Sequence, residues 1–155
     1  MWEPLQRFRA LDGGSQRLFL RASCLIPYVR ASLRLRGYNR TYERLRSKLH
    51  GAFASLKTPI ESREQVRRTA YMVHASVRYG VMKSSCLEES LTLWYLLRKQ
   101  GLEANLRIGV RKDKEKFEAH AWVEYEGEPL NQSEEVHLHY RAFEQEIIEP
   151  PTESR

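Results

Sequence analysis

The spacing of apolar residues follows a helical period up to about residue 100 and a strand period after it. A first helix is predicted from Gln16 to Arg36, because apolar residues recur along it at Leu18, Leu25, Val29 and Leu33. Pro27 is expected to kink this helix, and Gly37 is expected to end it. A second, shorter helix is predicted from about Asn39 to Leu49. The front of the chain is therefore expected to be helical.

Two further helices are predicted before the period changes. Thr58-Pro59 marks a break, and Ser62 followed by Gln65 matches the capping-box pattern of a helix start. One apolar stripe continues along this third helix until Gly80, at Val66, Ala70, Val73 and Val77. The fourth helix is predicted in the stretch CLEESLTLWYLLRKQG, residues 86–101, whose glycine stands at the position expected just past a helix end.

After this glycine, polar and apolar residues alternate as they do in β-strands. Strands are predicted at ANLRIGV, residues 104–110, and at FEAHAWVEY, residues 117–125, and EGEP supplies a turn into the returning segment LNQ. The run RKDKEK, residues 111–116, is expected to be a solvated loop between the first two strands. A last extended run from Tyr140 to Ile148 is expected to add a further strand. Helices followed by an antiparallel meander predict an α+β fold.

Length and composition are those of one globular domain over residues 1–155. With 155 residues and 41% apolar content, the chain can bury a core without disulfides or metal. Its two cysteines, Cys24 and Cys86, lie far apart, and no cysteine or histidine cluster has zinc-ligand spacing. We therefore expect free thiols in a reducing compartment, with no metal and no cofactor. No secretion signal or membrane-spanning stretch is found, which favours a cytoplasmic protein.

The charge is divided unequally between the two halves of the chain. Residues 1–80 carry 16 Lys/Arg against 5 Asp/Glu, whereas residues 81–155 carry 10 against 15. A basic half can attract nucleic acid, anionic lipid or an acidic protein. The alternative is that these arginines only solvate the outer faces of helices.

Cys86 and His120 are the residues with the clearest chemical potential. A helix N-terminus favours a thiolate, because its unpaired N–H groups and the helix dipole stabilise negative charge. Cys86 opens the fourth predicted helix, and His120 lies in the strand AHAWVEY, where its imidazole could act as the base of a thiolate–imidazolium pair. This requires the two groups to approach within bonding reach. The structural alternatives are a small buried cysteine and a packed histidine.

A third group could orient the imidazole from the returning strand. Asn131 and Gln132 both have suitable amide chemistry, and a one-residue change of hairpin register decides which of them shares the face of His120. His137 and His139 alternate along VHLHY and could ligate a metal, but no third ligand is visible. Cys24 falls in the apolar part of the first helix and is expected to be buried and inert.

The chain from Cys86 to His137 resembles the transglutaminase-like proteases of lasso-peptide biosynthesis, which remove the leader from a ribosomally made precursor. The shared features are a cysteine that opens a leucine-rich helix, a glycine, an IGV strand, an AHAWVE strand, and a hairpin that ends in asparagine. The basic front segment from Arg17 to Leu49 is similar to the front of the same family.

The resemblance implies a papain-like transglutaminase core with a Cys-His-Asn/Asp triad. Carried over, Cys86 is the nucleophile, His120 the general base and Asn131 the third member. Gln132 is the alternative third member, because many relatives have Asn-Asp where this chain has Asn131-Gln132. The resemblance divides the chain into a basic helical front, residues 1–60, and a catalytic core, residues 61–148.

The resemblance also implies the partners of the protein. They are the leader peptide of the precursor, a separate leader-recognition protein and a lasso cyclase, with neither nucleic acid nor stable membrane insertion. A second hypothesis is a non-catalytic binding module that uses the same scaffold and contacts a partner protein, nucleic acid or membrane through its basic helices. A third is acyl transfer to an amine instead of water.

Overall fold

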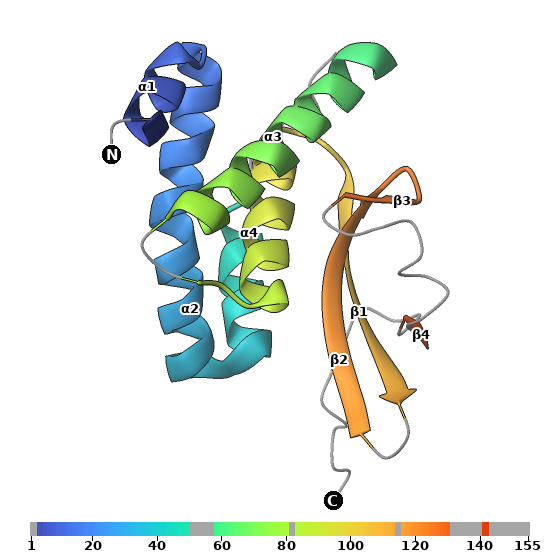
Figure 1. The fold of residues 1–155 in the computed structure, drawn as a ribbon. Coiled ribbons are helices and arrows are strands. Elements are labelled where there is room, and N and C mark those ends of the chain that lie inside the picture. Colours follow the sequence, from blue (N-terminus) through green and yellow to red (C-terminus); the bar gives the residue numbers. More distant parts are fainter. Residues whose placement is uncertain (1–2, 50–57, 81–82, 114–115, 131–140, 143–155) are drawn as a thin grey trace, which may run out of the picture.

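The computed structural model describes residues 3–49, 58–80, 83–113, 116–130 and 141–142 of the chain. Four helices come first: α1 (Glu3–Ala10), α2 (Gly13–Ser47), α3 (Pro59–Tyr79) and α4 (Cys86–Lys99). The strands follow: β1 (Ala104–Asp113), β2 (Lys116–Tyr125), β3 (Glu128–Pro129) and β4 (Arg141–Ala142). The order of elements confirms the α+β fold (Figure 1).

Helix α2 consists of two helical segments joined at Gly37. This glycine has φ 75° and ψ 179°, and it is the position inside α2 where the backbone leaves the helical region. Ser32 and Thr41, on either side of the break, share a buried hydrogen bond of 2.9 Å between their hydroxyl oxygens. The predicted stop at Gly37 is therefore confirmed, whereas the helical backbone continues through Pro27.

Helix α3 begins earlier than the sequence pattern predicted. Its N-cap is Thr58, whose side chain accepts a hydrogen bond from the N–H of Glu61, and the Glu61 carboxylate accepts one from the N–H of Thr58. The predicted capping box at Ser62 and Gln65 is therefore wrong. Pro59 explains the earlier start, because its fixed φ suits the first helical position and its missing N–H is not needed there.

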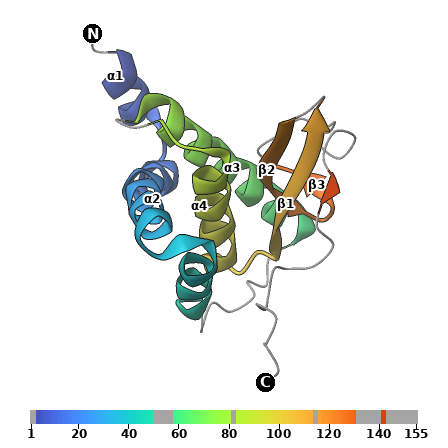
Figure 2. The same cartoon turned by 90° about the horizontal axis from the view of Figure 1, so that it is seen from below.

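Helix α4 lies between the other helices and the sheet, and it contacts α2, α3, β1 and β2 (Figures 1 and 2). Its central turns are almost fully buried, and Leu91, Leu93 and Leu97 are 0% exposed. These leucines share one apolar core with residues of α2, α3 and the sheet, including Val29, Val73 and Val123. After the C-cap at Gln100, Gly101 has φ 77°, as the sequence predicted for a residue just past the helix.

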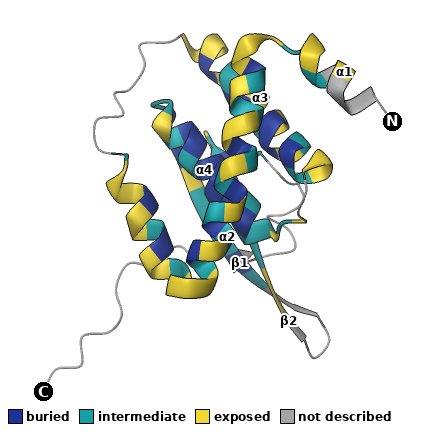
Figure 3. Cartoon of the chain, turned by 90° about the vertical axis from the view of Figure 1, so that its left-hand side faces the viewer, coloured by how far each residue is buried: buried dark blue, intermediate teal, exposed yellow. Residues whose placement is uncertain are grey.

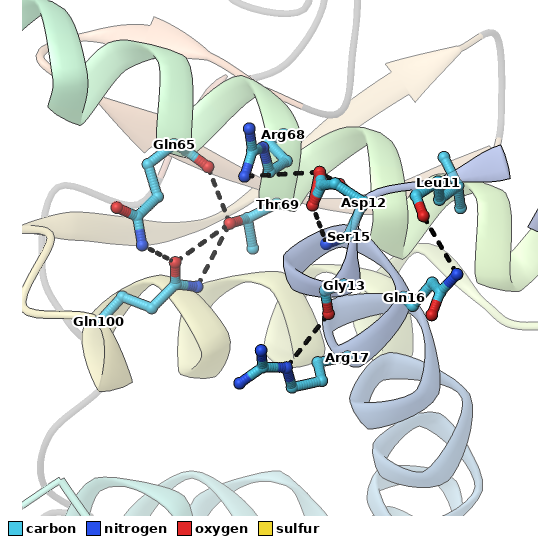
Figure 4. Close-up of polar contacts among 10 residues, drawn as sticks. All are labelled: Leu11, Asp12, Gly13, Ser15, Gln16, Arg17, Gln65, Arg68, Thr69 and Gln100. Carbon is cyan, nitrogen blue, oxygen red and sulfur yellow. Dashed lines mark hydrogen bonds and ion pairs between the residues drawn. The ribbon is translucent and has the colours of Figure 1, made fainter. Parts of the chain in front are cut away.

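Side-chain amides join the end of α4 to α3 (Figure 4). Gln100 Nε2 donates to Thr69 Oγ1 at 3.2 Å, and Gln65 Nε2 donates to Gln100 Oε1. Thr69 Oγ1 in turn donates to the carbonyl of Gln65 at 2.8 Å. These bonds fix the C-terminal end of α4, the end that leads into β1.

The strands form one antiparallel sheet in the order β3-β2-β1-β4. β1 pairs with β2 along its whole length, from Ala104 opposite Tyr125 to Asp113 opposite Lys116. The predicted loop at residues 111–116 is therefore wrong, because the two strands extend into it from both sides. The turn from β2 to β3 has positive φ at Glu126 and Gly127, as a type I′ two-residue hairpin turn requires.

Candidate active site

The structure places Cys86 at the first position of α4, with a half-buried side chain. Ser85 is the N-cap, and its hydroxyl oxygen accepts a hydrogen bond from the N–H of Glu88 at 3.3 Å. The Glu88 carboxylate accepts one from the N–H of Ser85 at 3.0 Å. This reciprocal capping box fixes the turn that carries Cys86, so the predicted position of the cysteine at a helix N-terminus is confirmed.

Arg30 of α2 reaches this same turn. Its Nε and Nη2 atoms each lie 3.0 Å from a carboxylate oxygen of Glu88, and Nη2 also donates to the main-chain carbonyl of Lys83. The hydrogen bond to Glu88 raises the pKa of the Arg30 guanidinium above its usual value, with the charge of Glu88 acting in the same direction. Sequence analysis did not single out Arg30, because nothing in the spacing of residues links positions 30 and 88.

Ser90 joins α4 to the strand that carries His120. The Ser90 hydroxyl donates to the carbonyl oxygen of Ala121 at 3.0 Å, and Ser90 is 0% exposed. Cys86 lies one helical turn before Ser90, about 6 Å along the axis, and His120 directly precedes Ala121. The structure therefore brings together the segments that carry Cys86 and His120.

The side chain of His120 extends from the sheet face that is opposite to the helical core. Val123 packs in the core with the α4 leucines, and side chains alternate between faces along a strand. His120 therefore shares the other face with Trp122 and Glu124. Helix α4 meets the edge of β2 next to His120, where Ser90 bonds to the carbonyl of Ala121.

Trp122 and Glu124 lie beside His120 and are held by a ring contact and hydrogen bonds. The rings of His120 and Trp122 are stacked, with centroids 6.3 Å apart and an angle of 18° between their planes. Trp122 Nε1 donates to one carboxylate oxygen of Glu124 at 2.8 Å, and Arg107 Nε of β1 donates to the other at 3.0 Å. Trp122 is 0% exposed, so the atoms packed around its ring restrict the orientation of the ring. Its burial identifies Trp122 as a packing residue.

The other residues singled out in the sequence lie outside the described residues or away from α4. Asn131, Gln132, His137 and His139 lie outside the part of the chain that the structure describes. Within the described part, no group of three or more potential metal ligands is found. The assignment of the triad to Cys86, His120 and Asn131 or Gln132 therefore stays a prediction.

The expectation that Cys24 is buried is wrong. Cys24 is exposed on α2, whereas Ala22 and Ile26 are buried, with 0% and 3% of their surface accessible. Successive residues of a helix turn by about 100°, so a residue two positions from Ala22 and from Ile26 lies on the opposite side. Any labelling experiment must therefore treat Cys24 as an accessible thiol.

A groove of about 440 Å³ lies between α2 and α3, on the side away from Cys86. Arg17, Arg21, Glu64, Arg68 and Gln100 are among the residues that line it. Gln100 caps the C-terminal end of α4, which is about 20 Å along the helix from Cys86. The groove is therefore separate from the candidate active site.

Helices α2 and α3 each have a solvent-exposed side (Figure 3). Many of the exposed residues on these two helices are arginines. On α2 the exposed arginines are Arg17, Arg21, Arg34, Arg36, Arg40, Arg44 and Arg46. Most of the basic charge predicted for the front of the chain thus lies on solvent-facing helix surfaces. No helix within the described residues is long and apolar enough to cross a membrane.

Comparison with known proteins identifies the family. A sequence model of the transglutaminase-like superfamily, which includes cysteine proteases, matches residues 15–145. No curated protein and no solved structure gave a significant match. The matched segment contains α2 from its third residue onward, α3, α4 and the strands β1 to β4 of the described residues, and so includes both Cys86 and His120. With this match over most of its length, the chain belongs to the transglutaminase-like superfamily.

Proposed function

We propose that this protein is a cysteine peptidase that removes the leader peptide from a ribosomally synthesised lasso-peptide precursor. The observation that carries the proposal is the position of Cys86 at the N-terminus of α4, beside the strand of His120, in a chain of this superfamily. The finer assignment to lasso-peptide precursors rests on the sequence resemblance.

The proposed reaction starts with attack of the Cys86 thiolate on the carbonyl at the leader–core junction. Main-chain N–H groups at the start of α4 stabilise the oxyanion that forms. As the C–N bond breaks, the His120 imidazolium gives its proton to the departing amine of the core peptide. Water then attacks the thioester, passes a proton to His120, and releases the leader carboxylate and the thiolate. No cofactor takes part.

The third member of the triad is proposed to be Asn131, with Gln132 as the alternative. Adjacent strand positions face opposite sides, so only one of the two can share the face of His120 in a regular strand. Separate Asn131→Ala and Gln132→Ala variants distinguish them. The orienting residue is the one whose loss lowers kcat, and loss of the other is expected to leave kcat near the wild-type value.

The protein is proposed to act as a single cytoplasmic domain over residues 1–155, with residues 1–60 as its front and 61–148 as its core. Its partners are the precursor, a separate leader-recognition protein and a lasso cyclase. The exposed arginines of α2 are the candidate docking surface for the recognition protein. The same arginines favour the second candidate function, a non-catalytic module that binds an acidic protein, nucleic acid or an anionic membrane.

Two experiments test the proposal. Iodoacetamide labelling across pH 5–10 is expected to show Cys86 reacting at lower pH than the exposed Cys24. If both thiols follow the same pH curve, the non-catalytic module is favoured. In the second experiment, the precursor and the recognition protein are incubated with the enzyme and the products are weighed by mass spectrometry.

Hydrolysis is expected to give a free core peptide with a new N-terminus and a leader with a new carboxylate. Acyl transfer gives a leader joined to an amine instead. Cys86→Ala is expected to abolish both products, and Cys24→Ser serves as the matched control that leaves them unchanged. A Cys86→Ala enzyme that still cleaves the precursor would rule out the proposed nucleophile.

A further inference from the structure

One side chain of α2 holds the chain on both sides of Cys86. The guanidinium of Arg30 makes a two-point contact with the Glu88 carboxylate, 3.0 Å at each point, and also binds the carbonyl of Lys83. Lys83 lies three residues before Cys86, and Glu88 lies two residues after it. Arg30 itself lies 53 positions from Lys83 and 58 positions from Glu88 in the sequence. The contact therefore ties the start of α4 to a separate helix.

The geometry of this contact restricts movement of the first turn of α4. A guanidinium that meets a carboxylate at two points resists rotation more than a single hydrogen bond does. Glu88 also accepts the N–H of Ser85, so its carboxylate is bonded from both α2 and the N-cap. The two side chains are largely buried, with 20% of Arg30 and 11% of Glu88 exposed.

The contact also places a positive charge on the carboxylate that stands two residues after Cys86. An unpaired carboxylate in the first turn opposes ionisation of a neighbouring thiol, and a guanidinium bonded to that carboxylate offsets its effect. Charged and titratable groups reach this region from several elements. They are Arg30 of α2, His74 of α3, Lys83 before α4, and Glu88 and Glu89 of α4, while His120 stands on the neighbouring strand β2.

We propose that Arg30 is a positioning residue for the Cys86 nucleophile, which it serves by fixing the first turn of α4 and neutralising Glu88. This inference rests on the proposed function, since it assigns a supporting residue to the same site. His74 does not replace Arg30, because it approaches Glu89 instead, with 3.5 Å between Nδ1 and Oε1 and a side chain 65% exposed.

The test is the pH dependence of Cys86 alkylation by iodoacetamide, measured in a Cys24→Ser background so that one thiol reacts. Arg30→Met removes the charge, Arg30→Lys keeps the charge without the fork, and Arg30→Met/Glu88→Gln removes both partners. Arg63→Met is the matched control. It breaks another arginine–glutamate pair, with Nη2 of Arg63 2.7 Å from Glu126, that lies away from the start of α4.

Arg30→Met is expected to raise the midpoint of the alkylation curve by about 0.5 to 1 pH unit, the effect of one uncompensated carboxylate near the thiol. Below the midpoint this corresponds to a roughly 3- to 10-fold slower reaction at fixed pH. Arg30→Lys is expected to show a smaller shift, and the double variant is expected to return close to the wild-type midpoint. Arg63→Met is expected to show none. Loss of packing alone does not predict rescue by Glu88→Gln.

An unchanged midpoint in folded Arg30→Met, or an equal shift in Arg63→Met, overturns the inference. So does a double variant that keeps the full shift. If circular dichroism shows that Arg30→Met does not fold, Glu88→Gln alone carries the test. It leaves Arg30 as an unpaired cation and is expected to lower the midpoint, and an unchanged midpoint overturns the inference.

The failure of this inference differs from the failure of the proposed function. If Cys86 of the otherwise wild-type chain shows the pH curve of an ordinary thiol, the proposed nucleophile is wrong before any variant is compared. If Cys86 reacts at low pH and the Arg30 variants leave its curve unchanged, only the role of Arg30 is wrong.

Discussion

The hydrogen bond between Ser90 and Ala121 offers a direct test of how α4 is attached to the sheet. Ser90 is 0% exposed and Ala121 is 2% exposed, and the bond between them is 3.0 Å long. The carbonyl of Val123 faces the β3 side, where it accepts the N–H of Leu130 at 2.9 Å. Ala121, two residues earlier on the same strand, presents its carbonyl to the same edge. The Ser90 hydroxyl is therefore the donor from α4 at this edge.

Replacing Ser90 by alanine removes the donor while leaving almost the same side-chain volume. The expected cost is that of leaving a buried acceptor without this donor, about 1 to 3 kcal/mol of the free energy of unfolding. For a chain of this size that corresponds to a fall of roughly 2 to 12 °C in melting temperature. Urea denaturation measures the change, and an unchanged m-value shows that the unfolding transition is the same.

Ser76→Ala is the matched control for this variant. Ser76 is 3% exposed, and its hydroxyl donates to Val73 of its own helix at 2.7 Å. The Val73 carbonyl keeps its main-chain partner in the helix, so the control is expected to cost less than about 1 kcal/mol. If Ser90→Ala is no more destabilising than Ser76→Ala, the contact does not hold α4 against β2 and the reasoning is refuted.

Three further variants test other parts of the structure. Leu93→Ala empties a fully buried position of α4 and is expected to cost about 2 to 5 kcal/mol in urea denaturation, whereas a loss below 1 kcal/mol would contradict the described core. Hydrogen bonds from Ser15 hold the pKa of Asp12 below its usual value. The Asp12 carboxylate therefore stabilises the fold at pH values above its unfolded-state pKa, and this stabilisation is lost as the pH falls through the folded-state pKa. Asp12→Asn keeps an N-cap residue, and its stability is expected to fall less than that of wild type between about pH 4 and pH 2, as measured by thermal unfolding; parallel curves would contradict this. Trp122→Phe removes the donor to the Glu124 carboxylate and is expected to lower the free energy of unfolding by about 1 to 3 kcal/mol in urea denaturation, and a loss below about 1 kcal/mol would show that the bond is not needed.

Local sequence patterns predicted the local structure well. The change of period after residue 100 separated helices from strands, and Gly37 and Gly101 marked positions where the backbone takes a positive φ. Cys86 was correctly placed at the start of α4. These features follow from residues that are neighbours in the chain, so spacing alone is sufficient to predict them.

Local patterns failed at two places in the chain. Ser62 and Gln65 match a capping box, but Thr58 and Glu61 form the real one, because Pro59 starts the helix earlier. Residues 111–116 are strongly charged and were expected to form a loop, but pairing between β1 and β2 extends the strands into this segment. In the second case backbone pairing with a neighbouring strand decides the structure, whatever the side chains prefer.

The sequence by itself determined the order of helices and strands and the start of α4, and it singled out Cys86 and His120 as the residues with chemical potential. Tertiary structure alone decided that Arg30 reaches Glu88, that Ser90 reaches Ala121, and that Cys24 faces solvent. The physical reason is that contacts between distant residues depend on how whole elements pack. Turning α2 by about half a turn about its axis would exchange its buried and exposed residues without changing any local pattern in the sequence.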